Sequence, residues 1–267
     1  MIRGLAAAAL AAALTLPSAA QELRLGATHT LEDSGVLPVL VDAFTKATGI
    51  RVRAVVAGTG QVMKYAENGD VDVVFTHSRK DEEKLVARGI GLARADVMWN
   101  DFVIAGPASD PARIRGERDA AAALKKIRAA GSKFVSRGDD SGTQKKELEL
   151  WAAAGGWSAW PGYLSSGEGA GRTLIMAYEM DAYDFVDRAT LRQLSPRYPL
   201  AILVEGDPRL LNEYGVTTLK PAANRAVRTR EADSFARWIV SEPARAIIAG
   251  YRVRGERAFY LPGEKRR

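Results

Sequence analysis

The feature that most constrains the fold is a regular alternation of short apolar runs with amphipathic segments. Residues 23–27, 51–56 and 71–75 have the length and composition of strands, and the third run has almost no polar interruption. Residues 34–47 carry apolar side chains at helical spacing, and a second helix is expected to end near 68–69. Continuous apolar strands joined by helices are typical of a parallel sheet covered on both faces. The sequence therefore predicts an α/β fold.

A second series of strands and helices follows the segment MWNDFVIAG at 98–106 and a polar stretch. Its expected elements are a strand at 134–135, a helix at about 143–153, a glycine-rich turn at 167–171 with a helix to about 178, and a strand at 201–204. The helical segments around 232–240 and 244–249 have too little strand around them to form a third domain. They are expected to return to the first one.

These two series predict two domains. The first is discontinuous and comprises residues 21–105 plus 205–267, and the second comprises 106–204. A chain of 267 residues is long enough for this division, because a domain typically takes roughly 100 to 200 residues. A discontinuous first domain requires the chain to cross between the domains twice.

Residues 1–20 have the features of a secretory signal peptide. A positive charge at Arg3 precedes an uncharged run at 4–16, and small residues occupy 18–20. The run is shorter than the roughly 20 residues that a membrane-spanning helix needs, so we expect cleavage before Gln21 rather than a membrane anchor. The chain contains no cysteine, which fits an exported protein stabilised by its core without disulfides. The predicted location is the periplasm.

The net charge of +6 bears on partners rather than on the fold. Basic and acidic residues are interleaved along most of the chain, so a nucleic-acid partner is not expected. The dense basic stretch at 252–267 is predicted to be a solvated tail. The positive excess is explained either by solubility or by attraction of an anion.

Polar and glycine-rich segments stand where ligands bind in open α/β sheets, at the carboxyl ends of strands and the starts of helices. They are Thr28-His29-Thr30, Gly58-Thr59-Gly60, the run SRGDDSGT at 136–143 and the turn at 167–171. Each alone is ordinary turn chemistry. Together they predict one cleft rich in backbone N–H donors and in the partial positive charge of helix N-termini.

Side chains in these segments suit a small, fully charged oxyanion. Arg137 offers a rigid fork of donors, and hydroxyls are present at Thr28, Thr30, Thr59, Ser141 and Thr143. Ser141 has an alternative role, because Ser-Gly-Thr-Gln at 141–144 reads as a helix capping box. Asp139 and Asp140 are likewise interpreted as acids that stabilise a helix start.

These motifs resemble those of the periplasmic tungstate-binding proteins of bacterial ABC importers. The similar stretches, in the same order, are GTGQVMKYAENGDVDVVFTHS, MWNDFVIAGP, FVSRGDDSGTQKKELELW, GRTLIMA and LLNEYGV. The resemblance implies a monomeric, two-lobed solute-binding protein of the type II-like fold, with its ligand in the interdomain cleft. It implies capture of a tetrahedral oxyanion, tungstate or molybdate, and delivery to a membrane permease with its ATPase. Closure is expected about crossovers near Ala105-Gly106 and Val204-Glu205.

The resemblance also assigns residues. The family's Thr-Thr-Thr-Ser run corresponds to Thr28-His29-Thr30-Leu31 here, so His29 replaces a hydroxyl, and the family's ligand-binding arginine corresponds to Arg137. His77 is expected to have a structural role. The predicted ligand-binding residues are Thr28, His29, Thr30, Gly58, Thr59, Arg137, Ser141 and Thr143.

Other function classes lack their motifs. The chain has no G-x-S-x-G elbow and no GxxxxGK[ST] phosphate loop, and two histidines without cysteine make a catalytic zinc site improbable. We therefore expect a binding protein without enzymatic activity, cofactor or cation site. The main alternative is a binding protein for phosphate, sulfate or a carboxylate. A secreted hydrolase is a less favoured alternative.

Overall fold

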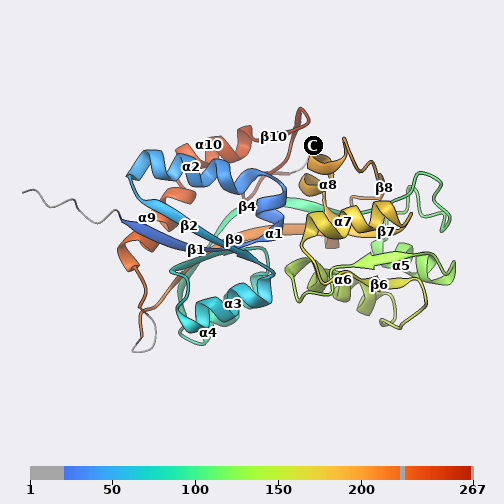
Figure 1. Cartoon of the computed structure of the whole chain (residues 1–267), viewed down its shortest axis with the longest axis horizontal. Coiled ribbons are helices and arrows are strands. Elements are labelled where there is room, and N and C mark those ends of the chain that lie inside the picture. The colour runs from blue at the N-terminus through green and yellow to red at the C-terminus, as the bar shows by residue number, and fades with distance from the viewer. Residues whose placement is uncertain (1–20, 223–225, 266–267) are drawn as a thin grey trace, which may run out of the picture.

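A nine-stranded sheet runs through both halves of the molecule in the order β2-β1-β3-β9-β4-β7-β5-β6, with β8 paired to β4 (Figure 1). The computed structural model describes residues 21–222 and 226–265, so the predicted signal peptide lies outside the described residues. Strands β2, β1 and β3 are mutually parallel, as are β7, β5 and β6. The central strands β9 and β4 are antiparallel to each other and to the strands beside them.

Each half forms a lobe with helices on both faces of its part of the sheet (Figure 1). Lobe 1 contains β1 (Glu22–Thr28), α1 (His29–Asp33), α2 (Val36–Thr48), β2 (Arg51–Ala57), α3 (Thr59–Asn68), β3 (Val73–Thr76), α4 (Arg79–Ala87), β9 (Leu211–Leu219), α9 (Thr229–Ile239), α10 (Glu242–Gly250), β10 (Arg252–Val253) and β11 (Glu256–Arg257). Lobe 2 contains α5 (Ala120–Ala129), β5 (Phe134–Ser136), α6 (Gly142–Ala153), β6 (Tyr163–Ser165), α7 (Ala170–Glu179), β7 (Tyr183–Asp187), α8 (Arg188–Leu194), β8 (Ala201–Val204) and the 3₁₀ turn η1 (Pro208–Leu210). Strand β4 (Gly91–Gly106) belongs to both.

Successive side chains of a strand point to opposite faces of the sheet, so each lobe has one hydrophobic core on each face of its part of the sheet. In β1, Leu23, Leu25 and Ala27 pack into the core beneath α2, α9 and α10, while the opposite face of this sheet meets α3 through Val62. A Cβ at Gly26 would lie 2.9 Å from Val62 Cγ1, so the absence of a side chain lets α3 approach β1 closely. Lobe 2 repeats this plan with α5 and α6 on one face and α7 and α8 on the other. The predicted α/β fold is confirmed.

Most expected elements are present, with shifted ends. The expected helix at 34–47 is α2, which begins at Val36 because its N-cap Gly35 adopts a left-handed conformation with φ of 78°, and the short helix α1 precedes it. The sheet is not parallel throughout, since β9, β4 and β8 run antiparallel to their neighbours. The strands β7 and β9 and the helix α5 were not foreseen. The last two helices return to lobe 1 as predicted, where Phe235 and Ile248 join its core.

The prediction of a solvated tail at 252–267 is wrong for the described part of this stretch. Val253 and Phe259 are buried in the core of lobe 1, and β10 and β11 form a hairpin. Tyr260 pairs with Trp99 of β4 through backbone hydrogen bonds of 2.9 Å, and their rings stack at 4.5 Å. The few apolar side chains of this basic stretch are the ones that pack. Its last two residues lie outside the described residues.

The passage between the lobes lies within β4 and at the start of β9. Strand β4 pairs with β9 as far as Asp101, and from Phe102 onward it pairs with β7. Phe102 and Leu210 are both buried in a core of lobe 2. We therefore propose that the chain crosses at Asp101-Phe102 and at Leu210-Leu211, rather than at Ala105-Gly106 and Val204-Glu205.

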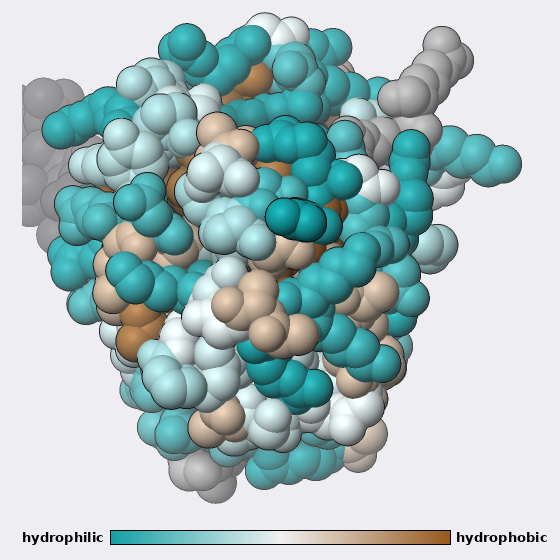
Figure 2. Space-filling model, turned by 90° about the vertical axis from the view of Figure 1, so that its right-hand side faces the viewer, coloured by the Kyte–Doolittle hydropathy of each residue, from teal (hydrophilic) through white to brown (hydrophobic). Residues whose placement is uncertain are grey.

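The end of lobe 2 that lies on the right of Figure 1 is mostly hydrophilic, with apolar side chains scattered among polar ones (Figure 2). This surface is typical of a protein face in contact with water. Within the part of the chain that the structure describes, no helix is long and apolar enough to cross a membrane.

Candidate functional site

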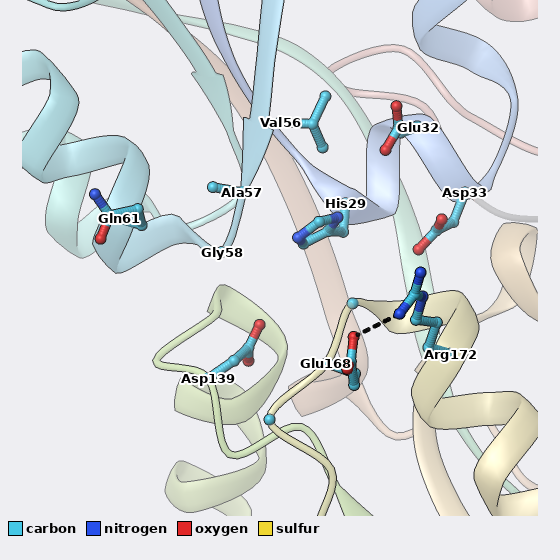
Figure 3. Close-up of a pocket in the computed structure, with 12 residues that line it drawn as sticks. His29, Glu32, Asp33, Val56, Ala57, Gly58, Gln61, Asp139, Glu168 and Arg172 are labelled. Carbon is cyan, nitrogen blue, oxygen red and sulfur yellow. Dashed lines mark ion pairs between the residues drawn. The ribbon is translucent and has the colours of Figure 1, made fainter.

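A pocket of about 620 Å³ lies between the two lobes (Figure 3). Its wall is built from α1, the end of β2 and the first turn of α3 in lobe 1, and from the loops before α6 and α7 and the first turn of α7 in lobe 2. The lining residues are His29, Glu32, Asp33, Val56, Ala57, Gly58, Gln61, Asp139, Gly167, Glu168, Gly169 and Arg172. Two of the predicted ligand-binding residues, His29 and Gly58, are among them.

The predicted hydroxyls are buried at the same junction and are not part of the described pocket wall. Thr28, Thr30, Thr59, Ser141 and Thr143 are each exposed by 2% or less. The two hydroxyl oxygens at 28 and 30 lie 3.1 Å apart. Across the lobes, the Thr59 hydroxyl oxygen accepts a 3.0 Å hydrogen bond from the backbone N–H of Gly142. The structure thus joins the β2–α3 turn to the start of α6.

Four helices begin at this junction, and most lack a local cap. Gly58 precedes α3 and Gly169 precedes α7, so neither helix can receive a side-chain cap from its own N-cap residue. The Thr28 side chain does not cap α1 either. Only α6 among these is capped conventionally, with the Ser141 hydroxyl accepting from the Gln144 N–H at 3.2 Å. The first N–H groups of these helices and the helix dipoles favour negative charge at this place.

The hydroxyl of Thr143 has no hydrogen-bond partner among the described residues, although its oxygen is buried. An unsatisfied buried hydroxyl costs roughly 1 to 3 kcal/mol, so native structures rarely leave one without a reason. Thr143 stands in the first turn of α6, at the junction where the four helices begin. A bound group with acceptor atoms would satisfy it.

Arg137 is buried, with 2% of its surface exposed, and it is already engaged. Its Nε donates to the backbone oxygen of Glu168 at 2.7 Å, and one terminal nitrogen forms an ion pair with Asp139. The other carboxylate oxygen of Asp139 accepts from the N–H of Ser141 at 3.2 Å. Lobe 2 therefore holds the guanidinium in a fixed orientation beside the pocket, and a ligand would share it with Asp139.

His77 follows β3 and is buried against the start of α6. The Asn212 side chain donates to Asn100 Oδ1 at 2.8 Å and to the Tyr214 hydroxyl at 3.0 Å, which fixes its own Oδ1 as the acceptor that faces His77 Nδ1 at 2.9 Å. Nδ1 of His77 therefore carries a proton and donates it to Asn212. Burial is the main cause that lowers the pKa of His77 to about 4. These contacts support the predicted structural role.

Sequence reasoning missed several residues of the wall. Asp33 accepts a hydrogen bond from the Gly171 N–H in lobe 2 at 2.8 Å, and Glu168 pairs with the exposed Arg172 at 3.5 Å (Figure 3). Glu168 belongs to the turn at 167–171 that the sequence analysis placed at the cleft, whereas Asp33, just before the expected helix at 34–47, gave no local signal of a contact with the other lobe. The residues that the structure describes contain no group of three or more His, Cys, Asp or Glu that could hold a metal ion.

Two α/β lobes joined by two crossing strands, with a polar pocket between them at the starts of helices, define the class of the two-lobed solute-binding proteins. Comparison with known proteins supports this class. The PBP superfamily domain matches residues 15–243.

Two relatives are named tungstate-binding protein TupA. The one from Peptoclostridium acidaminophilum is 44% identical over 85% of this chain and 80% of its own length. The one from Campylobacter jejuni is 32% identical over 88% of this chain and 89% of its own length. The chain therefore belongs to the tungstate-binding protein family within the PBP superfamily, which confirms the resemblance seen in the motifs.

Solved structures of tungstate-binding proteins have the same fold as this chain. The tungstate ABC transporter protein from Geobacter sulfurreducens superposes with a TM-score of 0.79 at 41% identity, covering 86% of this chain and 98% of that one. The tungstate-binding protein TupA of Desulfovibrio alaskensis superposes with a TM-score of 0.76 at 39% identity, covering 92% of this chain and all of that one. The two-lobed fold expected from the sequence is confirmed.

Proposed function

We propose that the protein captures a tetrahedral oxyanion, tungstate or molybdate, at the junction of the four helix starts. The observation that carries this proposal is the buried, partnerless hydroxyl of Thr143 beside helix N-termini that have no local cap. A dianion accepts hydrogen bonds and offers none, so it matches a set of N–H and O–H donors. The predicted residues Thr28, His29, Thr30, Gly58, Thr59, Arg137, Ser141 and Thr143 would supply these donors. The names of the relatives support the ligand class.

Protonated phosphate fits this junction less well. Near neutral pH phosphate often carries a proton that needs an acceptor, whereas tungstate and molybdate are unprotonated. Asp139 is paired with Arg137, and each of its oxygens already accepts one hydrogen bond within lobe 2, so accepting the phosphate proton would compete with that ion pair. An unpaired buried polar group costs roughly 1 to 3 kcal/mol, which disfavours the protonated anion.

The proposal includes export and transport. Residues 1–20 have the features of a signal peptide, and the family consists of binding proteins of ABC importers. We infer a monomer in the periplasm that delivers its anion to a permease driven by an ATPase subunit. It acts by binding and release, without a catalytic step. Closure of the lobes about β4 and β9 would enclose the anion.

Isothermal titration calorimetry of the mature protein against tungstate, molybdate, sulfate, phosphate and small carboxylates tests the proposal. We expect binding of tungstate or molybdate, and binding of phosphate that is weaker by about tenfold or more. Phosphate binding as tight as that of tungstate would show that a carboxylate serves as acceptor in the site. Failure of every oxyanion to bind would refute the proposed function.

A further inference from the structure

A carboxylate of lobe 1 caps a helix of lobe 2. Asp33, the last residue of α1, accepts the hydrogen bond from the backbone N–H of Gly171, in the first turn of α7, at 2.8 Å. The two residues are 138 positions apart in the sequence. Asp33 is half-buried in the pocket wall (Figure 3). This bond exists only while the lobes are in contact.

Helix α7 has no side-chain cap from its own N-cap residue, and Asp33 supplies one. The helix comprises ten residues, and its N-cap is Gly169, which has no side chain. The first N–H groups of a helix have no partner within it, and a carboxylate is favoured there by both hydrogen bonding and the helix dipole. In this protein the cap comes from the other lobe. Opening of the lobes would return these N–H groups to water.

The glycines of the turn at 167–171 fit this contact. A Cβ at Gly171 would lie 3.3 Å from the carboxyl carbon of Asp33, and a Cβ at Gly169 would lie 3.1 Å from the ring of His29. His29 and Asp33 are one turn apart on α1, so they face the start of α7 together. The absence of side chains on the turn lets α1 approach, which gives the glycine-rich turn a role in lobe contact.

We propose that Asp33 is a positioning residue that latches the closed lobes together and thereby slows release of the bound oxyanion. The inference rests on the proposed function. Because the bond forms on closure and breaks on opening, it acts on dissociation more than on encounter. A purely electrostatic role has the opposite sign: a carboxylate in the wall repels an anion, so its removal would slow release.

Tungstate release measured by stopped-flow tryptophan fluorescence separates these roles. Asp33→Ala should increase the dissociation rate by about tenfold, the effect of losing one capping hydrogen bond. Asp33→Asn retains an acceptor oxygen and should give a smaller increase. The matched control is Glu32→Ala, which removes the same charge from the same wall at an exposed neighbour. Its dissociation rate should not rise. An unchanged or slower release by Asp33→Ala overturns the latch.

A second measurement needs no ligand. The chain has no cysteine, so spin labels can be attached through Ala47→Cys in α2 and Glu179→Cys in α7, both exposed. Pulsed electron paramagnetic resonance should show that Asp33→Ala shifts the distances between the lobes of the free protein to longer values. Identical distributions in parent and Asp33→Ala overturn the latch, whether or not tungstate binds. If the parent binds no oxyanion but the distances still lengthen from parent to Asp33→Ala, the proposed function is refuted and the latch is supported.

Discussion

The two lobes differ in the partners of most of their buried acids, although lobe 2 also has one buried acid paired with a cation, Asp207 with Arg209 at 2.5 Å. In lobe 1, buried acids are paired with cations: Glu82 lies 2.6 Å from Arg94, and Asp72 lies 2.5 Å from Arg24. In lobe 2, Glu147 is buried with neutral donors, namely Ser136 at 2.6 Å, Tyr163 at 2.9 Å and Trp151 at 3.0 Å. Asp184 is buried with one oxygen that has no partner among the described residues.

This difference indicates where the structure serves stability and where it serves binding. The ion pairs of lobe 1 lie away from the described pocket wall and neutralise one another. Burial raises the pKa values of Glu147 and Asp184 in lobe 2, and the positive charge of Arg137 opposes the rise for Asp184. Arg137 is thus held beside the pocket by its ion pair with Asp139, and it also interacts electrostatically with the buried Asp184. The predictions below address this contrast, beginning with the largest effect.

The largest effect should come from breaking a pair in lobe 1. Glu82→Gln removes the charge that faces Arg94, whose side chain is only 9% exposed. Breaking a buried ion pair typically costs 3 to 5 kcal/mol, and because Arg94 keeps Asp96 at 2.6 Å we expect about 3 kcal/mol. Urea unfolding followed by circular dichroism measures this loss.

Glu147→Gln in lobe 2 is the matched control. The substitution keeps the shape of the side chain, and the hydroxyls of Ser136 and Tyr163 can reorient toward the new amide. We expect a loss of about 1 kcal/mol or less in the free energy of unfolding. A cost equal to that of Glu82→Gln would mean that the two lobes do not differ in this respect.

Arg137→Ala should have the largest effect on binding. It removes the buried cation and leaves Asp139 in the pocket wall without its ion pair. We expect oxyanion affinity to fall by roughly 2 kcal/mol or more, about thirtyfold, with folding largely retained. Calorimetry measures the loss.

Arg172→Ala supplies the comparison, because it removes the same charge from a side chain that is 77% exposed in the same wall. Exposed charges contribute little, so its effect on affinity should be small. Adding Asp139→Ala to Arg137→Ala should restore part of the lost affinity. If Arg172→Ala proved the more damaging change, the assignment of Arg137 would be wrong.

His77 gives stability a pH dependence with a definite sign. Its pKa is lowered to about 4 by burial, so between that value and the ordinary value near 6.5 the unfolded chain binds more protons than the folded one. The parent therefore loses stability from this group as the pH falls below about 6.5. The loss by pH 5 is about 2 kcal/mol relative to pH 7.5.

Asp187 opposes this trend, because burial raises its pKa to about 6 and the folded state takes up its proton first as the pH falls. Comparison with His77→Gln isolates the histidine. The variant should gain about 2 kcal/mol relative to the parent between pH 7.5 and pH 5 in urea unfolding. A difference that stays constant with pH would show that His77 is not buried as a neutral group.

Local signals predicted the parts of the fold and site that depend on neighbours in the sequence. The strand β1, the start of α6 and its Ser141 cap follow from residues that are adjacent in the chain. The strand β9 was missed because its partners β3 and β4 are remote in the sequence, and Asp33 was missed because its partner lies in the other lobe. Spacing along one helix cannot show which lobe its polar face will meet.

The smallest effect concerns His29, which the motif resemblance aligns with a hydroxyl and whose ring lies against Gly169 of lobe 2. His29→Thr should keep oxyanion affinity within about twofold, because a hydroxyl replaces one donor by another. His29→Leu should weaken affinity by about 1 kcal/mol, roughly fivefold, because a donor is lost without replacement. Calorimetry with tungstate measures both.

The outcome also bears on the contrast between the lobes. If His29 donates to the anion, lobe 1 contributes the imidazole N–H and hydroxyl donors, and lobe 2 contributes the fixed charge of Arg137. If His29→Leu binds as well as the parent, the imidazole acts only as a packing surface for the α7 turn. Gly169→Ala then becomes the informative change, because its Cβ would lie 3.1 Å from the His29 ring and should disturb the contact between the lobes. The same substitution should disturb this contact much less in the His29→Thr background, because the threonine side chain is shorter.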